Sequence, residues 1–132
     1  RGMVNMNDGI KKTLALLNLT RKNNCVVVVN NPVNMGMIRK VKDYVTWGPV
    51  SEETFKELVD KRGKEKTTRL TDSKKKYSYN ALEVNGKKYS PTFPLNPPKK
   101  GFGRKGIKMA FKVGGALGDR GEKMNDLIKR MI

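Results

Sequence analysis

Apolar residues in the first part of the chain follow two different spacings. Ile10, Leu14 and Leu17 recur every three or four positions, and this period predicts a helix with one buried face. An asparagine or aspartate at position 5, 7 or 8 can cap the start of this helix by accepting a hydrogen bond from a free backbone N–H. Residues 25–29, Cys-Val-Val-Val-Val, form instead a continuous apolar run that predicts a strand buried on both faces. Residues 30–32, Asn-Asn-Pro, are expected to end that strand.

The alternation of helix and strand continues to position 63. A second helix is predicted from apolar residues at helical spacing, which are Met37, Ile38, Val41, Tyr44 and Val45. Residues 45–47 can start another strand before Gly48-Pro49 stops it. Residues 51–54 are typical of a helix start and Gly63 of a helix end, so a third helix is predicted between them. Its inward side chains are expected to be Phe55, Leu58 and Val59.

This alternation predicts an α/β protein, because strands that follow one another through helices are joined by crossover connections. One strand alone cannot form a sheet. We therefore expect a partner strand that ends at Arg1-Gly2, with the chain beginning just after that strand or inside it.

Apolar residues become sparser after position 63. Residues 83–89 predict a small hairpin with Asn85-Gly86 as its turn. Residues 96–112 contain prolines, glycines and lysines that disfavour helix and sheet. A last helix is predicted over residues 120–131, where apolar residues again recur at helical spacing. We therefore expect two segments, an α/β core in residues 1–63 and a basic extension in residues 64–132 that ends in a helix.

The balance of charge changes this picture most. The chain of 132 residues carries 29 lysines and arginines against 12 aspartates and glutamates, a net charge of +17, and most of the excess lies after position 63. A surface of this charge repels its own copies and persists best beside a polyanion. Because each neutralised phosphate releases counterions, nucleic acid is the predicted partner.

The residue types needed for catalysis and metal binding are scarce. The chain has no histidine, which removes the commonest general base and metal ligand. Cys25 is the only cysteine, so it cannot form an internal disulfide or a multi-thiolate metal site. We expect Cys25 to act as a small buried hydrophobic residue. No apolar stretch is long enough for a membrane span, and no signal-peptide pattern opens the sequence. We expect no enzymatic activity, no cofactor, no metal, no membrane partner, and a reducing intracellular setting.

Two glycine clusters admit more than one interpretation. Residues 101–106 spell G-x-G-x-x-G, but a dinucleotide fingerprint needs a strand before it and a helix after it, and neither is predicted here. We favour the alternative, in which the glycines let a basic backbone lie flat against phosphates. Phe102 can stack on an exposed base or anchor this segment to the core. In residues 114–121 a phosphate nest before the last helix competes with a tight loop capped by Asp119, and we favour the loop.

Residues 13–45 resemble the family of large-subunit ribosomal protein thirty. The positions that match in order and spacing are Thr13, Leu14, Leu17, Leu19, Arg21, Asn24, Val26, Met37, Ile38, Val41, Tyr44 and Val45. Residues 36–48 and 114–123, the latter preceded by residues 95–99, further resemble the archaeal branch, whose C-terminal extension bacterial members lack. Residues 74–89 depart from this pattern, because archaeal relatives usually have a helical stretch there. Asp119 also departs, standing where similar proteins tend to carry an aromatic residue.

The resemblance implies a ferredoxin-like core, a small β-α-β-α-β sheet with helices on one face, clamped onto large-subunit ribosomal RNA. The basic extension would thread among RNA helices, beside neighbouring ribosomal proteins and close to the small ribosomal RNA of that subunit. The implied role is a structural one in the cytoplasmic ribosome. No homo-oligomer is expected.

The residues expected to contact RNA are mainly basic side chains. They are Arg1, Lys11, Lys12, Arg21, Lys22, Asn31, Arg39, Lys40, Lys42, Trp47, Lys99, Lys100, Phe102, Arg104, Lys105, Lys108, Arg120 and Lys123. The competing hypothesis is a DNA- or chromatin-binding protein, in which the basic second half coats duplex DNA without reading its sequence.

Overall fold

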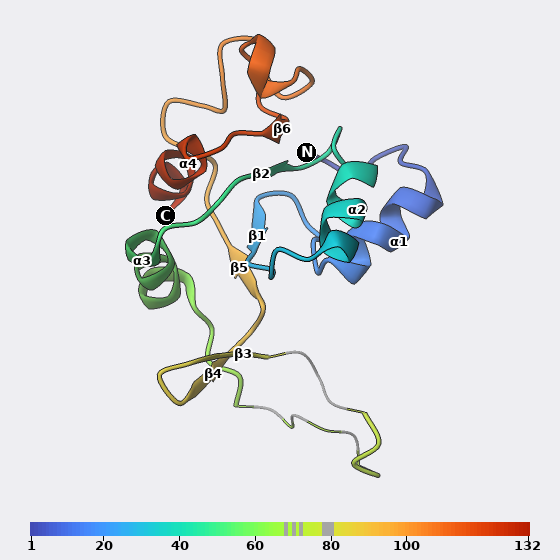
Figure 1. Cartoon of the computed structure of the whole chain (residues 1–132), viewed down its shortest axis with the longest axis vertical. Coiled ribbons are helices and arrows are strands. Elements are labelled where there is room, and N and C mark those ends of the chain that lie inside the picture. Colours follow the sequence, from blue (N-terminus) through green and yellow to red (C-terminus); the bar gives the residue numbers. More distant parts are fainter. Residues whose placement is uncertain (68, 70, 72, 78–80) are drawn as a thin grey trace.

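Helices alternate with short strands in the computed structural model of the chain, and this confirms the predicted α/β class (Figure 1). The structure describes residues 1–67, 69, 71, 73–77 and 81–132, so part of the departing segment 74–89 lies outside the described residues. In chain order the elements are α1 (Asp8–Leu16), β1 (Asn24–Val26), α2 (Pro32–Lys40), β2 (Thr46–Trp47), α3 (Glu52–Arg62), β3 (Leu82–Val84), β4 (Lys87–Tyr89), β5 (Thr92–Pro94), the 3₁₀ helix η1 (Phe111–Val113), β6 (Gly118–Asp119) and α4 (Lys123–Met131).

Local capping signals place the starts of two helices where the sequence predicts them. The Asn7 side chain accepts a hydrogen bond from the Gly9 backbone N–H at the start of α1. The Ser51 hydroxyl accepts one from the Thr54 N–H at the start of α3. Each bond pairs a backbone donor that has no partner inside its own helix.

Helix α2 differs from its prediction at both ends. It begins at Pro32, which the sequence interpretation took only as the end of a strand, and Asn31 stands before it as the cap residue. Proline is well suited to the first position of a helix, because its fixed φ is helical and the N–H that it lacks would have no partner there. The helix ends at Lys40, so Tyr44 and Val45 lie beyond it and lead into β2.

The apolar run of residues 25–29 is only partly a strand. Strand β1 ends at Val26, and the side chains of Val28 and Val29 are 41% and 71% exposed, so the prediction of burial on both faces is wrong. Its partner is β5, with Cys25 opposite Phe93 in an antiparallel pair. The chain start does not supply this partner: Arg1 lies outside any strand, and its amino group donates a hydrogen bond to the Tyr44 carbonyl at 3.1 Å.

The described strands form three two-stranded sheets where one continuous core sheet was expected. Besides the β1–β5 pair, β2 pairs in parallel with β6, and β3 pairs antiparallel with β4. The β3–β4 hairpin is confirmed, and its turn residues Asn85 and Gly86 have positive φ angles of 52° and 75°. This conformation explains the Asn-Gly pair, because most other residues are strained in it.

Two clusters of buried side chains form the core. The first packs α1 against α2 and consists of Met6, Leu14, Leu17 and Val41. The second consists of Leu58, Val59, Phe93 and Ile128. It joins α3 to β5 and α4, so the segments before and after position 63 contribute to the same core, and α3 and α4 lie side by side (Figure 1). None of the helices in the described part of the chain is both long and apolar enough to cross a bilayer.

Candidate nucleic-acid interface

A long loop between β5 and β6 carries a high positive charge. We call residues 99–117 the basic loop, which forms the projecting lobe at the top of Figure 1. It contains no acidic residue and six exposed basic ones, which are Lys99, Lys100, Arg104, Lys105, Lys108 and Lys112. None of the six takes part in the ion pairs found among the described residues. All six charges are therefore available to an external anion.

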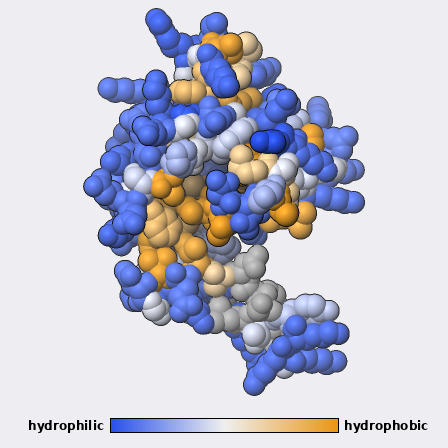
Figure 2. Space-filling model, in the orientation of Figure 1, coloured by the Kyte–Doolittle hydropathy of each residue, from blue (hydrophilic) through white to orange (hydrophobic). Residues whose placement is uncertain are grey.

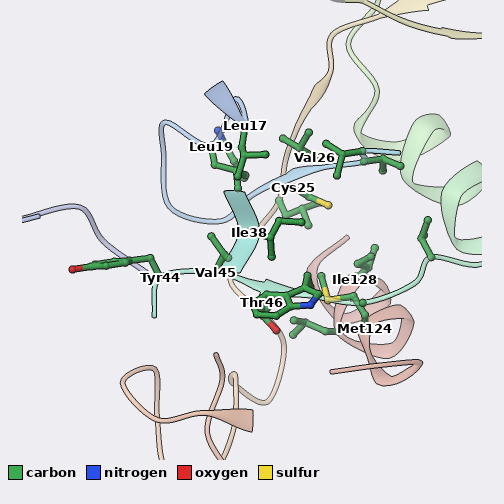
Figure 3. Close-up of a pocket in the computed structure, with 18 of the residues that line it drawn as sticks. Leu17, Leu19, Cys25, Val26, Ile38, Tyr44, Val45, Thr46, Met124 and Ile128 are labelled. Atoms are coloured by element: carbon green, nitrogen blue, oxygen red, sulfur yellow. The ribbon is translucent and has the colours of Figure 1, made fainter. Parts of the chain in front are cut away.

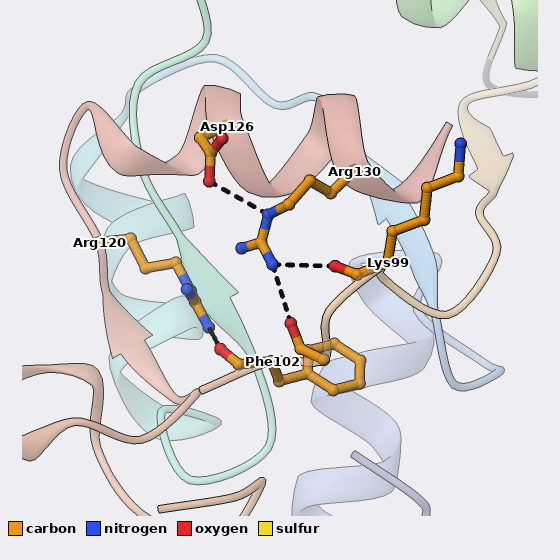
Figure 4. Close-up of polar contacts among 6 residues, drawn as sticks. Lys99, Phe102, Arg120, Asp126 and Arg130 are labelled. Atoms are coloured by element: carbon orange, nitrogen blue, oxygen red, sulfur yellow. Dashed lines mark hydrogen bonds and ion pairs between the residues drawn. The ribbon is translucent and has the colours of Figure 1, made fainter. Parts of the chain in front are cut away.

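Arg130 holds the base of the basic loop from the side of α4 (Figure 4). Its Nη1 donates to the Lys99 carbonyl at 3.2 Å and to the Gly101 carbonyl at 2.9 Å. Its Nε bonds to the Asp126 carboxylate at 3.1 Å, one helical turn earlier, which fixes the direction of the guanidinium. The loop therefore leaves the core at a defined angle.

Arg120 holds the loop from the other side, and it corrects one expectation from the sequence. Its side chain is buried, 6% exposed, where an outward contact with RNA was expected. Its Nη2 donates to the carbonyls of Phe102 at 3.2 Å and Ala116 at 2.9 Å, and its guanidinium lies 4.6 Å from the Phe111 ring centroid. Burial lowers the pKa of this guanidinium. We therefore leave Arg120 out of the candidate contact residues.

Backbone bonds and glycine contacts hold the basic loop together internally. The N–H of Lys105 donates to the Gly114 carbonyl at 3.1 Å, and that of Ala116 to the Met109 carbonyl at 2.9 Å. A Cβ on Gly103 would lie 2.7 Å from the Gly115 carbonyl oxygen, so only glycine allows this approach. The G-x-G-x-x-G sequence therefore serves the packing of the loop. It lies in turns and not between a strand and a helix, the setting that a dinucleotide site needs.

The second glycine cluster folds as the tight loop that we favoured. The Asp119 carboxylate accepts a hydrogen bond from the Gly121 N–H at 2.9 Å and closes the turn before α4. Phe102 is half-buried at the base of the basic loop, where its carbonyl accepts from Arg120. This position suits an anchoring role for the ring.

The other residues expected to contact RNA lie outside the basic loop. Helices α1 and α2 and the loops next to them carry one set, all exposed, which are Lys11, Lys12, Arg21, Lys22, Asn31, Arg39, Lys40 and Lys42. Of these, Lys11 forms an ion pair with Asp8 at 3.2 Å. Arg1 packs over the Tyr44 ring at 5.4 Å. Lys123 is exposed beside the basic loop, whereas Trp47 is half-buried in β2.

An apolar cleft of about 730 Å³ lies between the α1–α2 pair and α4 (Figure 3). Side chains such as Leu17, Ile38 and Val45 line one side, and Met124 and Ile128 the other. Residues of β1 and β2 also line it, and among the described strands β1 pairs only with β5 and β2 only with β6. Burial raises the pKa of the Cys25 thiol, which lines the cleft, to about 11. Arg1, Arg21 and Lys22 also line the cleft, beside its mainly apolar walls.

The described residues contain no group of three or more cysteine, aspartate and glutamate side chains placed to hold a metal ion.

Comparison with known proteins decides the family. The family described as "Ribosomal protein L30p/L7e" matches residues 1–45. The chain is 43% identical to "Large ribosomal subunit protein uL30" of Nanoarchaeum equitans over 146 aligned positions, which cover 100% of this chain and 94% of the relative. The chain belongs to the L30p/L7e family. The proteins of the same name from Methanococcus maripaludis and Methanopyrus kandleri are each 38% identical to it, with 100% of this chain and 95% and 99% of the relatives covered.

The match of the L30p/L7e family to residues 1–45 includes the positions between 13 and 45 on which the resemblance was based. The full-length relatives extend the likeness over the basic loop and α4, and all three are archaeal. The resemblance to the archaeal branch is thereby confirmed.

Two residues that matter to the candidate interface were not predicted from the sequence: one positions the basic loop, and the other belongs to it. Arg130 was not selected, although Asp126 four residues earlier is the spacing of a helical ion pair. Lys112 lies in the basic loop, exposed like its five basic neighbours, and completes the set.

Proposed function

We propose that this chain is a structural, RNA-binding constituent of the large ribosomal subunit and that it acts without catalysis. The observation that carries the proposal is its full-length similarity to proteins named large ribosomal subunit protein uL30. Association with large-subunit ribosomal RNA and with neighbouring ribosomal proteins follows from the family. As part of the ribosome, the protein would act in the cytoplasm.

The basic loop supports this proposal physically. Six exposed cations without an acidic partner in the loop suit closely spaced phosphates, because each contact releases counterions from the RNA. Arg120 and Arg130 fix the base of the loop through bonds to backbone carbonyls. Since the loop is ordered before binding, less conformational entropy is lost when RNA is bound.

The finer assignment concerns which RNA each surface contacts. We propose that the basic loop and Lys123 contact the large ribosomal RNA. We assign the cations of α1, α2 and the loops next to them to a second RNA surface, for which the small ribosomal RNA of the same subunit is the candidate. Two separate basic surfaces on one small protein support a bridging position between two RNA segments.

The test removes charge from the basic loop at four positions. Lys99, Lys100, Arg104 and Lys105 are changed together to alanine, and affinity for large-subunit ribosomal RNA is measured by filter binding. We expect a loss of roughly tenfold to hundredfold, since each exposed charge contact contributes about 0.2–1 kcal/mol.

The matched control removes four exposed lysines outside both basic surfaces, namely Lys56, Lys61, Lys64 and Lys87. It lowers the net charge equally and should reduce affinity much less. Equal losses in both variants would show that bulk charge and not the loop binds RNA. Competition with duplex DNA is the second arm: DNA that displaces the protein as well as structured RNA would favour the DNA-binding hypothesis.

A further inference from the structure

The tip of the basic loop exposes apolar side chains between its lysines. Ile107, Met109 and Val113 are 45%, 44% and 50% exposed. The same loop buries Ala116 and Leu117 almost completely, at 4% and 8% exposed, so it has an interior of its own. Figure 2 shows apolar atoms in this lobe at the top of the view, among hydrophilic side chains that project outward.

Hydrogen bonds fix the backbone at two of these three residues, Met109 and Val113. The Met109 carbonyl accepts from the N–H groups of Ala116 and Leu117, and the Ala110 carbonyl from those of Val113 and Gly115. A Cβ on Gly115 would overlap the Met109 carbonyl, so the two segments touch through their backbones. The backbone of residues 109–117 therefore cannot turn Met109 and Val113 inward without breaking several of these bonds.

Charge identifies the kind of partner. Lys105, Lys108 and Lys112 alternate with the apolar residues, and no acid lies in the basic loop. Apolar and cationic side chains therefore alternate at the tip of the loop, which suits a ligand with an apolar face between two anionic groups. A nucleotide whose base is unpaired has this chemistry, whereas a continuous duplex hides its base faces in the stack.

We propose that Ile107, Met109 and Val113 form a platform for one unpaired RNA base, while the lysines around them bind the phosphates on either side. This inference rests on the proposed RNA-binding function and names the kind of RNA element that the loop selects.

The test compares two RNA hairpins that differ by one nucleotide, a bulged 2-aminopurine present in one and absent from the other. We expect the full chain to bind the bulged hairpin about tenfold more tightly, with a change in 2-aminopurine emission. The variant Ile107→Thr, Met109→Gln and Val113→Thr should lose this preference and the emission change but retain its affinity for the paired hairpin.

The matched control changes three exposed apolar residues elsewhere, Val4→Thr, Leu16→Gln and Val33→Thr, which are 72–86% exposed. It should keep the preference for the bulge, and circular dichroism should show both variants folded.

Absence of the preference in the original chain, or its survival in the loop variant, would overturn the platform. Failure to bind either hairpin would instead contradict the proposed function. If the loop variant keeps its RNA affinities but no longer joins large-subunit particles, the platform contacts a neighbouring protein, and the RNA proposal is wrong.

Discussion

Arg120 and Lys123 lie three residues apart and both approach the Phe111 ring, at 4.6 Å and 5.9 Å, yet their surroundings are opposite. Lys123 is exposed, whereas Arg120 donates hydrogen bonds to two backbone carbonyls and to the Thr46 hydroxyl. Nothing in the local sequence separates the two, because burial depends on strands and loops distant in the chain. For this reason the sequence interpretation placed both on the RNA side.

This difference predicts unequal effects of the same substitution. Arg120→Met should lower the free energy of unfolding by about 2–4 kcal/mol, because it leaves buried carbonyls without donors. Lys123→Met, its matched control beside the same ring, should change that free energy by less than about 0.5 kcal/mol. Urea denaturation of the free protein measures both. Equal effects would mean that the Arg120 bonds do not stabilise the fold.

Cys25 gives a second prediction at this scale. Its pKa of about 11 means that the folded state keeps the thiol protonated where the unfolded chain, with a pKa of about 8.5, has lost the proton. The stability that this difference contributes is therefore fully present below about pH 8.5 and is lost as the pH rises toward 11, by about 3 kcal/mol. Cys25→Ala should lack this part of the decline. Iodoacetamide should also react slowly with the folded protein at pH 8.5 and quickly in urea.

At the scale of elements, the sequence predicted the features that depend on residues close together in the chain. The caps Asn7 and Ser51 and the Asn85-Gly86 turn act over two to four residues, and all three occur as predicted. The length of β1 was misjudged, because a run of valines looks alike whether or not other segments cover it. Its pairing with β5 joins positions far apart in the chain, and no local pattern indicates such a pair.

Two glycines make the same substitution act in opposite directions. Gly36 lies within α2 and Gly86 in the hairpin turn at a φ of 75°, and a Cβ would have open space at both. Gly36→Ala should stabilise the protein by about 0.5–1 kcal/mol, because alanine favours the helix. Gly86→Ala should destabilise it by about 1–2 kcal/mol, because alanine is strained at this positive φ even though its Cβ would touch no neighbouring atom. Thermal denaturation measures both. A Gly86→Asn variant, which tolerates positive φ, should lie between Gly86→Ala and the original chain.

The charge of the whole molecule and its concentration after position 63 could be predicted from the sequence, but the fixed shape of the loop could not. A net charge of +17 indicated a polyanion, and the structure adds that the loop with six of the cations is held by Arg120 and Arg130. That loop is fixed to α4 and β2, on opposite sides of it in the sequence, so its order follows from tertiary contacts.

This arrangement predicts a steep dependence of RNA binding on salt. If all six cations contact phosphates, affinity should fall by about 10³ between roughly 50 mM and 200 mM salt. The variant without Lys99, Lys100, Arg104 and Lys105 should show a log–log slope less steep by about 3–4. Filter binding over a salt series measures both slopes, and a flat response would contradict electrostatic binding.

The apolar cleft and the strand edges beside it affect the free protein before it meets RNA. Strand edges that pair with no other described strand and lie next to apolar surface can pair with other chains, and the mutual repulsion of highly charged copies opposes this. A short polyanion such as polyphosphate would remove the repulsion without covering the cleft. We therefore expect turbidity when polyphosphate neutralises the protein, and a clear solution at the same salt concentration when polyphosphate is left out. Newly made copies would thus depend on meeting their large folded RNA before smaller anions of the cell.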